Sequence, residues 1–307
     1  MHPDLECDLG IPAPDWANEV EADLDIADLI AAMAQGDQFL HEVARSALFQ
    51  PLTDPDVIAY RQDVLADCVD HLDTVKRLYG VSTEAVQVER KILLGWNSNK
   101  PRTRLHRSRA CMVGYVALLR RLRVEADAHT DEFLSCGMRT LFTSIRSELA
   151  DDYLADVQRC LALLEFRGGL LETARLGMAN EGTHYVLRAP ERTRPGLWET
   201  LTSGWGHHTV TVAERDMAGA ESVGELQEHG SAVTAEALGQ SADHVKAYFH
   251  ALRQQLGFYL ACVNLRGRLL AAGLPLCRPE IVQEPGIRAH QLFDPLLASP
   301  RTFAGRQ

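Results

Sequence analysis

Positive charge is concentrated in one stretch of an otherwise acidic chain. Between Lys100 and Arg123 there are eight basic residues and no acidic one, although the formal net charge of the protein is −11. The planar fork of arginine can hold a phosphate through two hydrogen bonds, so the stretch suggests a DNA-contacting surface. A solvated turn followed by a helix surface explains the same pattern equally well. The candidate DNA contacts are Lys100, Arg102, Arg104, Arg107 and Arg109, with a second, weaker patch at Arg188, Arg192 and Arg194.

Other groups with reactive side chains lack a spacing that supports chemistry. Asp151 and Asp152 are neighbours on a predicted helix and cannot face each other. His207 and His208 alternate across a predicted strand, so only one of them can join a given site. The seven cysteines form no Cys-x-x-Cys pair and are expected to be reduced, mostly as small core residues. We therefore expect no catalytic residue and no metal site.

Nucleotide binding by these residues is not expected either. The chain has no Gly-x4-Gly-Lys-Ser/Thr loop, and none of its four lysines follows a glycine. Trp198 and Trp205 lie in a Pro- and Gly-rich stretch and could stack on a base, but anchoring a small β-layer is the simpler role.

The elements that must position these groups are mainly helices. Apolar residues recur at three- and four-residue steps in two long stretches, 134–164 and 245–263. The first would form a helix of roughly 50 Å, with Gly137 as a possible kink. Asp54 followed by Pro55 predicts a helix start, since aspartate caps and proline suits the first helical position. The basic stretch breaks this periodicity around Pro101, and a helix is expected to resume at about residue 107.

Strand-like sequence is confined to a glycine-bounded segment between the long helices. Segments 169–176 and 183–188 predict a hairpin, and 207–213 predicts a third strand. The fold class is therefore mainly α, with a small β-rich insertion.

Composition adds two expectations. No run of about 18 apolar residues appears, so no membrane partner is expected. The N-terminus lacks a basic segment followed by an apolar run, so a soluble, cytoplasmic protein is expected.

Three blocks of sequence occur in an order that is typical of one family. Residues 49–64 contain a Pro-Leu turn entering a helix with Arg61 and Gln62, residues 174–188 form the glycine-punctuated hairpin, and residues 258–296 form the third block. Together they resemble the MutS family of DNA mismatch-repair ATPases, in a branch with short N-terminal regions. The resemblance covers roughly residues 22 to 297. The mismatch-reading N-terminal domain and the phosphate loop of the family are absent from the sequence.

The resemblance implies a helical core with long antiparallel lever helices. The expected parts are an extended leader (1–20), the core with an outgoing lever helix (21–167), a β-rich insertion like a reduced clamp tip (168–216), a returning lever helix (217–277) and a linker toward an ATPase domain (278–307). ATP and Mg²⁺ are expected only with that missing ATPase domain. Expected partners are DNA, an ATPase domain in cis or in trans, and a second copy of the chain.

Two functions remain open at this stage. The chain is either the core and lever portion of a MutS-like DNA-repair ATPase or a stand-alone helical scaffold or adaptor without DNA or nucleotide activity. The acidic net charge favours the second. Whether the reading frame continues into a glycine-rich loop ending Gly-Lys-Ser would separate them.

Overall fold

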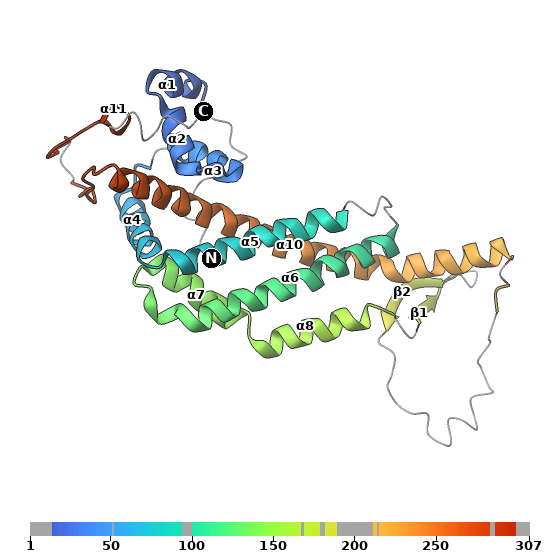
Figure 1. Ribbon diagram of the computed structural model, residues 1–307. Coiled ribbons are helices and arrows are strands. Elements are labelled where there is room, and N and C mark those ends of the chain that lie inside the picture. Colours follow the sequence, from blue (N-terminus) through green and yellow to red (C-terminus); the bar gives the residue numbers. More distant parts are fainter. Residues whose placement is uncertain are drawn as a thin grey trace. The chain divides into compact units, whose positions relative to one another are not determined.

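Helices dominate the computed structural model, which describes residues 14–50, 52–93, 100–166, 169–178, 182–188, 211–213, 215–282 and 286–298. The helices are α1 (Ala17–Asp23), α2 (Ile26–Ala34), α3 (Gln38–Leu48), α4 (Pro55–Asp70), α5 (Leu72–Leu93), α6 (Pro101–His129), the short 3-10 turn η1 (Thr130–Glu132), α7 (Cys136–Glu148), α8 (Asp151–Leu163), α10 (Met217–Ala271) and α11 (Pro295–Ala298) (Figure 1). The strands β1 (Leu171–Leu176) and β2 (Gly182–Arg188) form one antiparallel pair. A mainly α fold with a small β insertion is therefore confirmed.

The chain divides into two compact units, neither of which is one continuous segment. The first unit comprises residues 1–86, 118–151 and 247–307, and the second comprises 87–117 and 152–246. The boundaries at 86, 117 and 246 fall inside α5, α6 and α10. These three helices therefore supply residues to both units.

Local sequence explains where the first helices begin and end. The Asp54 carboxylate accepts hydrogen bonds from the N–H groups of Asp56 at 2.8 Å and Val57 at 3.4 Å, and Pro55 is the first residue of α4. This is the predicted cap. Helix α2 ends at a left-handed Gln35 followed by Gly36 at φ +87°, also as predicted. Helix α1 begins at Ala17, inside the range 1–20 that was predicted as an extended leader, and residues 1–13 of that range lie outside the described part of the chain.

The stretch 134–164 is two helices, so the prediction of one long helix was wrong. The break lies between α7 and α8, where Leu149 leaves the helical conformation at φ −102° and ψ 44°. Two carboxylates at the start of α8, Asp151 and Asp152, favour a new helix N-terminus there. Gly137 is not the kink. It lies in the first turn of α7, where a Cβ would come within 2.5 Å of the Tyr60 hydroxyl of α4.

The core of the first unit forms where the C-terminal half of α10 packs on α2, α3 and α5. Ala261 is fully buried against Ile30 and Met33 of α2. Gly257 admits the side chains of α3 and α5, since a Cβ there would lie 3.3 Å from Leu40 and 3.6 Å from Tyr79. Two further contacts of α10 lie in the same unit: the Arg253 guanidinium lies over the Phe39 ring, and the Asn264 amide donates to the Met33 carbonyl. Burial raises the pKa of the Tyr248 hydroxyl, and the charge of Glu148 of α7 raises it further.

The β-hairpin belongs to the second unit and packs on α10. Its strands pair from Leu171 opposite Arg188 to Leu176 opposite Gly182, with an irregularity between Thr173 and Arg175. The predicted third strand is not seen at residues 211–213, and residues 207–210 lie outside the described part of the chain.

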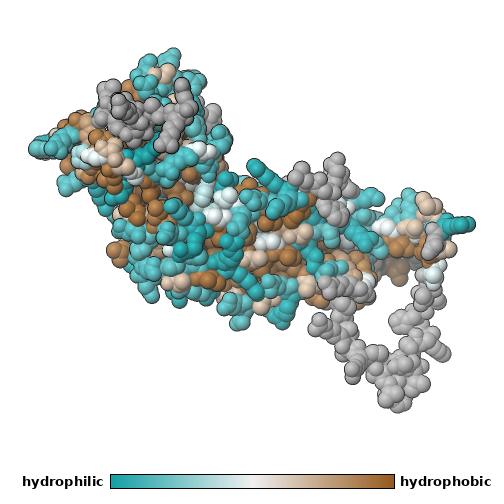
Figure 2. Space-filling model, in the orientation of Figure 1, coloured by the Kyte–Doolittle hydropathy of each residue, from teal (hydrophilic) through white to brown (hydrophobic). Residues whose placement is uncertain are grey.

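Hydrophobic side chains reach the surface in scattered patches on the face shown in Figure 2. Leu134, Met178 and Val233 are 84%, 93% and 70% exposed. Scattered exposure of this kind is ordinary for protein surfaces and does not by itself mark a docking face. Among the described helices, none combines the length and apolarity that a membrane crossing requires.

Candidate functional site

The basic stretch is helical from Pro101 onward, which corrects the prediction of an irregular connector up to about residue 107. Proline at the first helical position starts α6 without losing a hydrogen bond. The backbone N–H of Arg102 in that first turn donates to the Glu228 carboxylate of α10 at 2.9 Å. A carboxylate from a distant helix therefore caps α6 and offsets the unfavourable placement of cations at a helix N-terminus.

Two of the candidate arginines also use their side chains within the protein. The guanidinium of Arg102 donates to the amide oxygen of Gln227, and Arg104 forms an ion pair of 2.9 Å with Glu236. The Arg104 and Glu236 side chains are 41% and 55% exposed, so solvent screens this pair. Both contacts hold the start of α6 against α10.

Arg109 is more deeply placed than the others. Its Nε donates to the carbonyl of Leu161 in α8 at 2.6 Å, and its terminal nitrogen lies 3.1 Å from the Glu165 carboxylate. Lys100 is exposed and Arg107 is half-buried. The stretch 100–123 contains no acidic residue of its own. In the fold, however, α10 and the residues at the end of α8 place carboxylates beside it.

The second predicted patch is only partly described. Arg188 is exposed at the end of β2, and its Nε donates weakly to the Thr173 hydroxyl at 3.4 Å. Arg192 and Arg194 lie outside the described residues, as do Trp198 and Trp205. Arg188 and the start of α6 both belong to the second unit.

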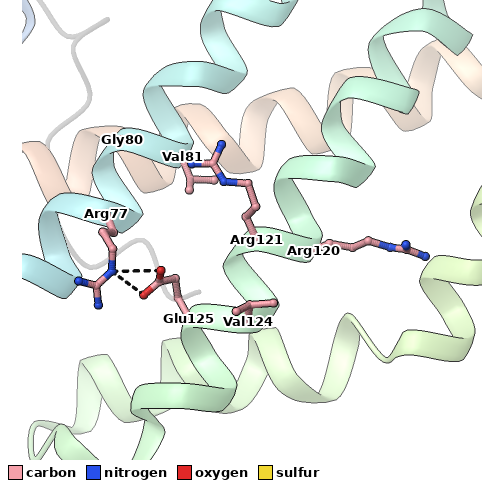
Figure 3. Close-up of a pocket in the computed structure, with 7 residues that line it drawn as sticks. All are labelled: Arg77, Gly80, Val81, Arg120, Arg121, Val124 and Glu125. Atoms are coloured by element: carbon pink, nitrogen blue, oxygen red, sulfur yellow. Dashed lines mark hydrogen bonds and ion pairs between the residues drawn. The ribbon is translucent and has the colours of Figure 1, made fainter.

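The C-terminal part of the basic stretch lines a pocket in the first unit, which the sequence did not indicate. The pocket has a volume of ≈ 360 Å³ and lies between α5 and α6 (Figure 3). It is lined by Arg77, Gly80, Val81, Arg120, Arg121, Val124 and Glu125. The sequence does not indicate this pocket, because α5 supplies one of its walls and the residue spacing of α5 and α6 does not specify how the two helices pack.

Ion pairs fix two of the arginines at this pocket. The Nε of Arg77 donates to both oxygens of Glu125, at 2.9 and 3.1 Å (Figure 3). Its Nη2 donates to the Thr74 hydroxyl and lies 2.9 Å from the Nε2 of His129. Arg121 is paired with Glu84. The hydrogen bond to Glu84 raises the pKa of the Arg121 guanidinium further above its usual range.

No group suited to metal binding was found in the described part of the chain. Nowhere in it do three or more histidine, cysteine, aspartate or glutamate side chains come together in an arrangement that could hold an ion.

The described elements define a class of helical protein in which long helices link two units, one of which carries a β-hairpin. Comparison with known families gives the family itself: the MutS2 N-terminal domain matches residues 53–272. The match covers more than half of the chain, which therefore belongs to the MutS2 N-terminal domain family. No curated protein and no solved structure matches the chain.

Proposed function

We propose that the chain is the core and lever portion of a MutS-like ATPase that acts on DNA, and that it couples an ATPase domain to DNA binding. The observation that carries this proposal is that α5, α6 and α10 each contribute residues to both compact units. A continuous helix is stiff along its axis because backbone hydrogen bonds join each turn to the next. Shared helices are therefore suited to carrying a displacement from one unit to the other.

ATP and Mg²⁺ enter this proposal only through the ATPase domain, present in cis or in trans. The 307 residues are expected neither to bind nor to hydrolyse ATP, since they contain no phosphate-binding loop. A second copy of the chain is a further expected partner, and the cytoplasm is the expected location.

DNA contact is assigned to the candidate residues of the second unit: Lys100, Arg102, Arg104, Arg107, Arg109, Arg188, Arg192 and Arg194. A phosphate arriving at Arg104 has to replace Glu236. That exchange costs little, because an exposed ion pair contributes only about 0–1 kcal/mol. Arg109 is held by a carbonyl as well as a carboxylate and is the least available of the described arginines.

The test is binding of fluorescent duplex and branched DNA across a salt series, measured by anisotropy. Each neutralised phosphate contributes about −0.9 to the slope of log K against log salt. Replacing Arg102, Arg104 and Arg107 with alanine should flatten the slope by about two to three units. A matched control replaces arginines of the first unit, Arg139, Arg266 and Arg268, and should leave the slope unchanged. An equal slope in the first triple variant, with its helical circular dichroism intact, would remove these residues from the interface.

A second function, a helical scaffold or adaptor without DNA activity, is favoured by one observation. Arg102, Arg104 and Arg109 already have partners within the protein. Under this alternative their charge stabilises the packing of α6 on α10 and α8. Absence of DNA binding by the wild-type chain even at low salt would support it.

A further inference from the structure

The pocket between α5 and α6 is open at its base because a glycine stands there. A Cβ built at Gly80 would meet no atom within 4 Å. Beside it, Val81 is buried at 2% exposure, whereas Val124 of the facing helix is 66% exposed. The pocket thus offers an apolar floor and one exposed aliphatic wall, and an entering side chain would cover both.

The rim of the same pocket is cationic. Arg77 and Arg121 are held by carboxylates, as described above. Arg120 is exposed and forms no ion pair or hydrogen bond with any residue that the structure describes. In Figure 3 its side chain extends away from Arg77 and Glu125. Since both oxygens of Glu125 are engaged by Arg77, the rim offers, among the residues that the structure describes, the cation of Arg120 without a partner and no unpaired carboxylate.

The apolar floor and the cationic rim together determine which kind of ligand fits the pocket. An apolar floor contributes nothing to binding a bare phosphate, but it favours burial of an aliphatic side chain. A basic ligand would be repelled by the Arg120 guanidinium and would find the carboxylates of Glu125 and Glu84 already paired with Arg77 and Arg121. A volume of ≈ 360 Å³ is near the lower end of the usual range for ligand pockets, about 300–1,000 Å³. It therefore suits one side chain and its adjoining backbone rather than a folded element.

We propose that this pocket docks a segment of a partner protein in which an aliphatic side chain is flanked by carboxylates. The aliphatic side chain enters over Gly80 against Val81 and Val124, and a flanking carboxylate pairs with Arg120. Complementarity of charge and of apolar surface carries the proposal. It goes beyond the proposed coupling of ATPase to DNA, because it adds a protein partner at residues of the first unit, none of which is a candidate DNA contact.

The first test uses the full chain and a fluorescein-labelled pentapeptide, Asp-Glu-Leu-Glu-Asp, with anisotropy as the readout. We expect saturable binding that Arg120→Glu weakens at least about tenfold, because a like charge then faces the peptide carboxylates. The matched control is Arg139→Glu, the same charge change at an exposed arginine of α7. Equal weakening by the two variants would mean that only the net charge of the protein is sensed, and would overturn the proposal.

A second variant fills the pocket without disturbing the fold. Gly80→Leu places a side chain where the structure has open space, and leucine is a better helix former than glycine. It should abolish peptide binding while the thermal midpoint of unfolding stays the same or rises. Gly267→Leu is the matched control, since that helical glycine also has nothing within 4 Å of its Cβ position. Unchanged binding by Gly80→Leu would overturn the proposal even if Arg120→Glu behaves as expected.

Two further probes identify the occupant. A peptide with glycine in place of leucine should bind at least about tenfold more weakly, since the apolar contact is lost. Equal binding would show a purely ionic site. Direct binding of a fluorescent 20-base-pair duplex that both Arg120→Glu and Gly80→Leu weaken, with no saturable binding of the peptide to the wild type, would assign the pocket to nucleic acid instead of an acidic peptide. These outcomes are independent of the salt slope that tests the DNA contacts of the second unit.

Discussion

Glu172 of β1 illustrates how one side chain can fix the position of a hairpin. Its carboxylate lies where a side chain at position 230 of α10 would have to be: a Cβ at Gly230 would come within 1.9 Å of Oε1. That oxygen is buried without a hydrogen-bond partner among the described groups. Burial raises the pKa of the Glu172 carboxyl, and the electrostatic interaction with His229 lowers it by less. Tyr185 of β2 stacks on His229 with ring centroids 5.4 Å apart.

The raised pKa predicts that docking of the hairpin depends on pH. The docked state holds the Glu172 proton more tightly than the undocked state, so docking is strongest below the ordinary glutamate pKa of about 4.3 and weakens as pH rises through the higher docked pKa. Glu172→Gln should remove this dependence and keep the hairpin docked at neutral pH. The ring signals of Tyr185 in NMR spectra report the stacking. Glu225→Gln, at an exposed position of α10, should leave the wild-type pH profile unchanged.

At the scale of elements, the helix starts show what sequence can and cannot predict. Asp54 caps α4 from two residues away, so the residue pattern was sufficient. The start of α6 is capped by Glu228, 126 residues from the Arg102 N–H. Helix α7 has a local cap, the Ser135 hydroxyl, which accepts from the Met138 N–H at 3.3 Å. The N–H groups of Leu134 and Ser135 just before α7 donate to Asp67, which is 67 and 68 residues away. No local pattern contains these pairings, because they exist only once the helices have packed.

The break between α7 and α8 was missed for a related reason. Apolar residues continue at helical spacing across it, from Ile145 through Leu149 to Tyr153. Periodicity reports which residues share a face but is insensitive to a change in helix direction. Tyr153 is in fact 56% exposed, so the stripe does not mark one buried face.

Removal of the Asp67 carboxylate should destabilise the first unit. Asp67 is 5% exposed and accepts hydrogen bonds from the backbone N–H groups of Leu134, at 3.2 Å, and Ser135, at 2.7 Å, where α7 begins. Asp67→Ala should lower the free energy of unfolding by about 1.5–3 kcal/mol, the usual value for a hydrogen bond to a charged group. Urea denaturation followed by circular dichroism measures the change. Asp70→Ala, at an exposed position of the same helix, should cost less than about 0.5 kcal/mol.

For the whole molecule, sequence patterns predicted the helical class, the hairpin and a MutS-like family, but they did not predict which charged side chains form ion pairs. Ion pairs such as Arg104–Glu236 and Arg121–Glu84 join residues 132 and 37 positions apart. The basic stretch therefore looks unbalanced in the sequence and is partly balanced in the fold. The candidate DNA site stays a prediction, and the pocket between α5 and α6 had no counterpart in the sequence analysis.

The C-terminal half of α10 is expected to be central to global stability. Leu256 is 3% exposed and sits next to Gly257, where α3 and α5 meet α10. Leu256→Ala should cost about 2–5 kcal/mol, from lost burial and the cavity left behind. Leu134→Ala, at a site 84% exposed, should change the unfolding free energy by less than about 0.5 kcal/mol. A loss below about 1 kcal/mol for Leu256→Ala in urea melts would contradict its place in the core.

The division of the chain into interleaved units restricts how the gene can change. The second unit is made of residues 87–117 and 152–246, so no single continuous stretch of codons encodes it. An insertion or deletion in α5 alone shifts that helix against α6 and rotates every later side chain by about 100° per residue, since a turn holds 3.6 residues. This part of the protein can therefore be lengthened or shortened only when compensating changes occur at several separated places in the sequence.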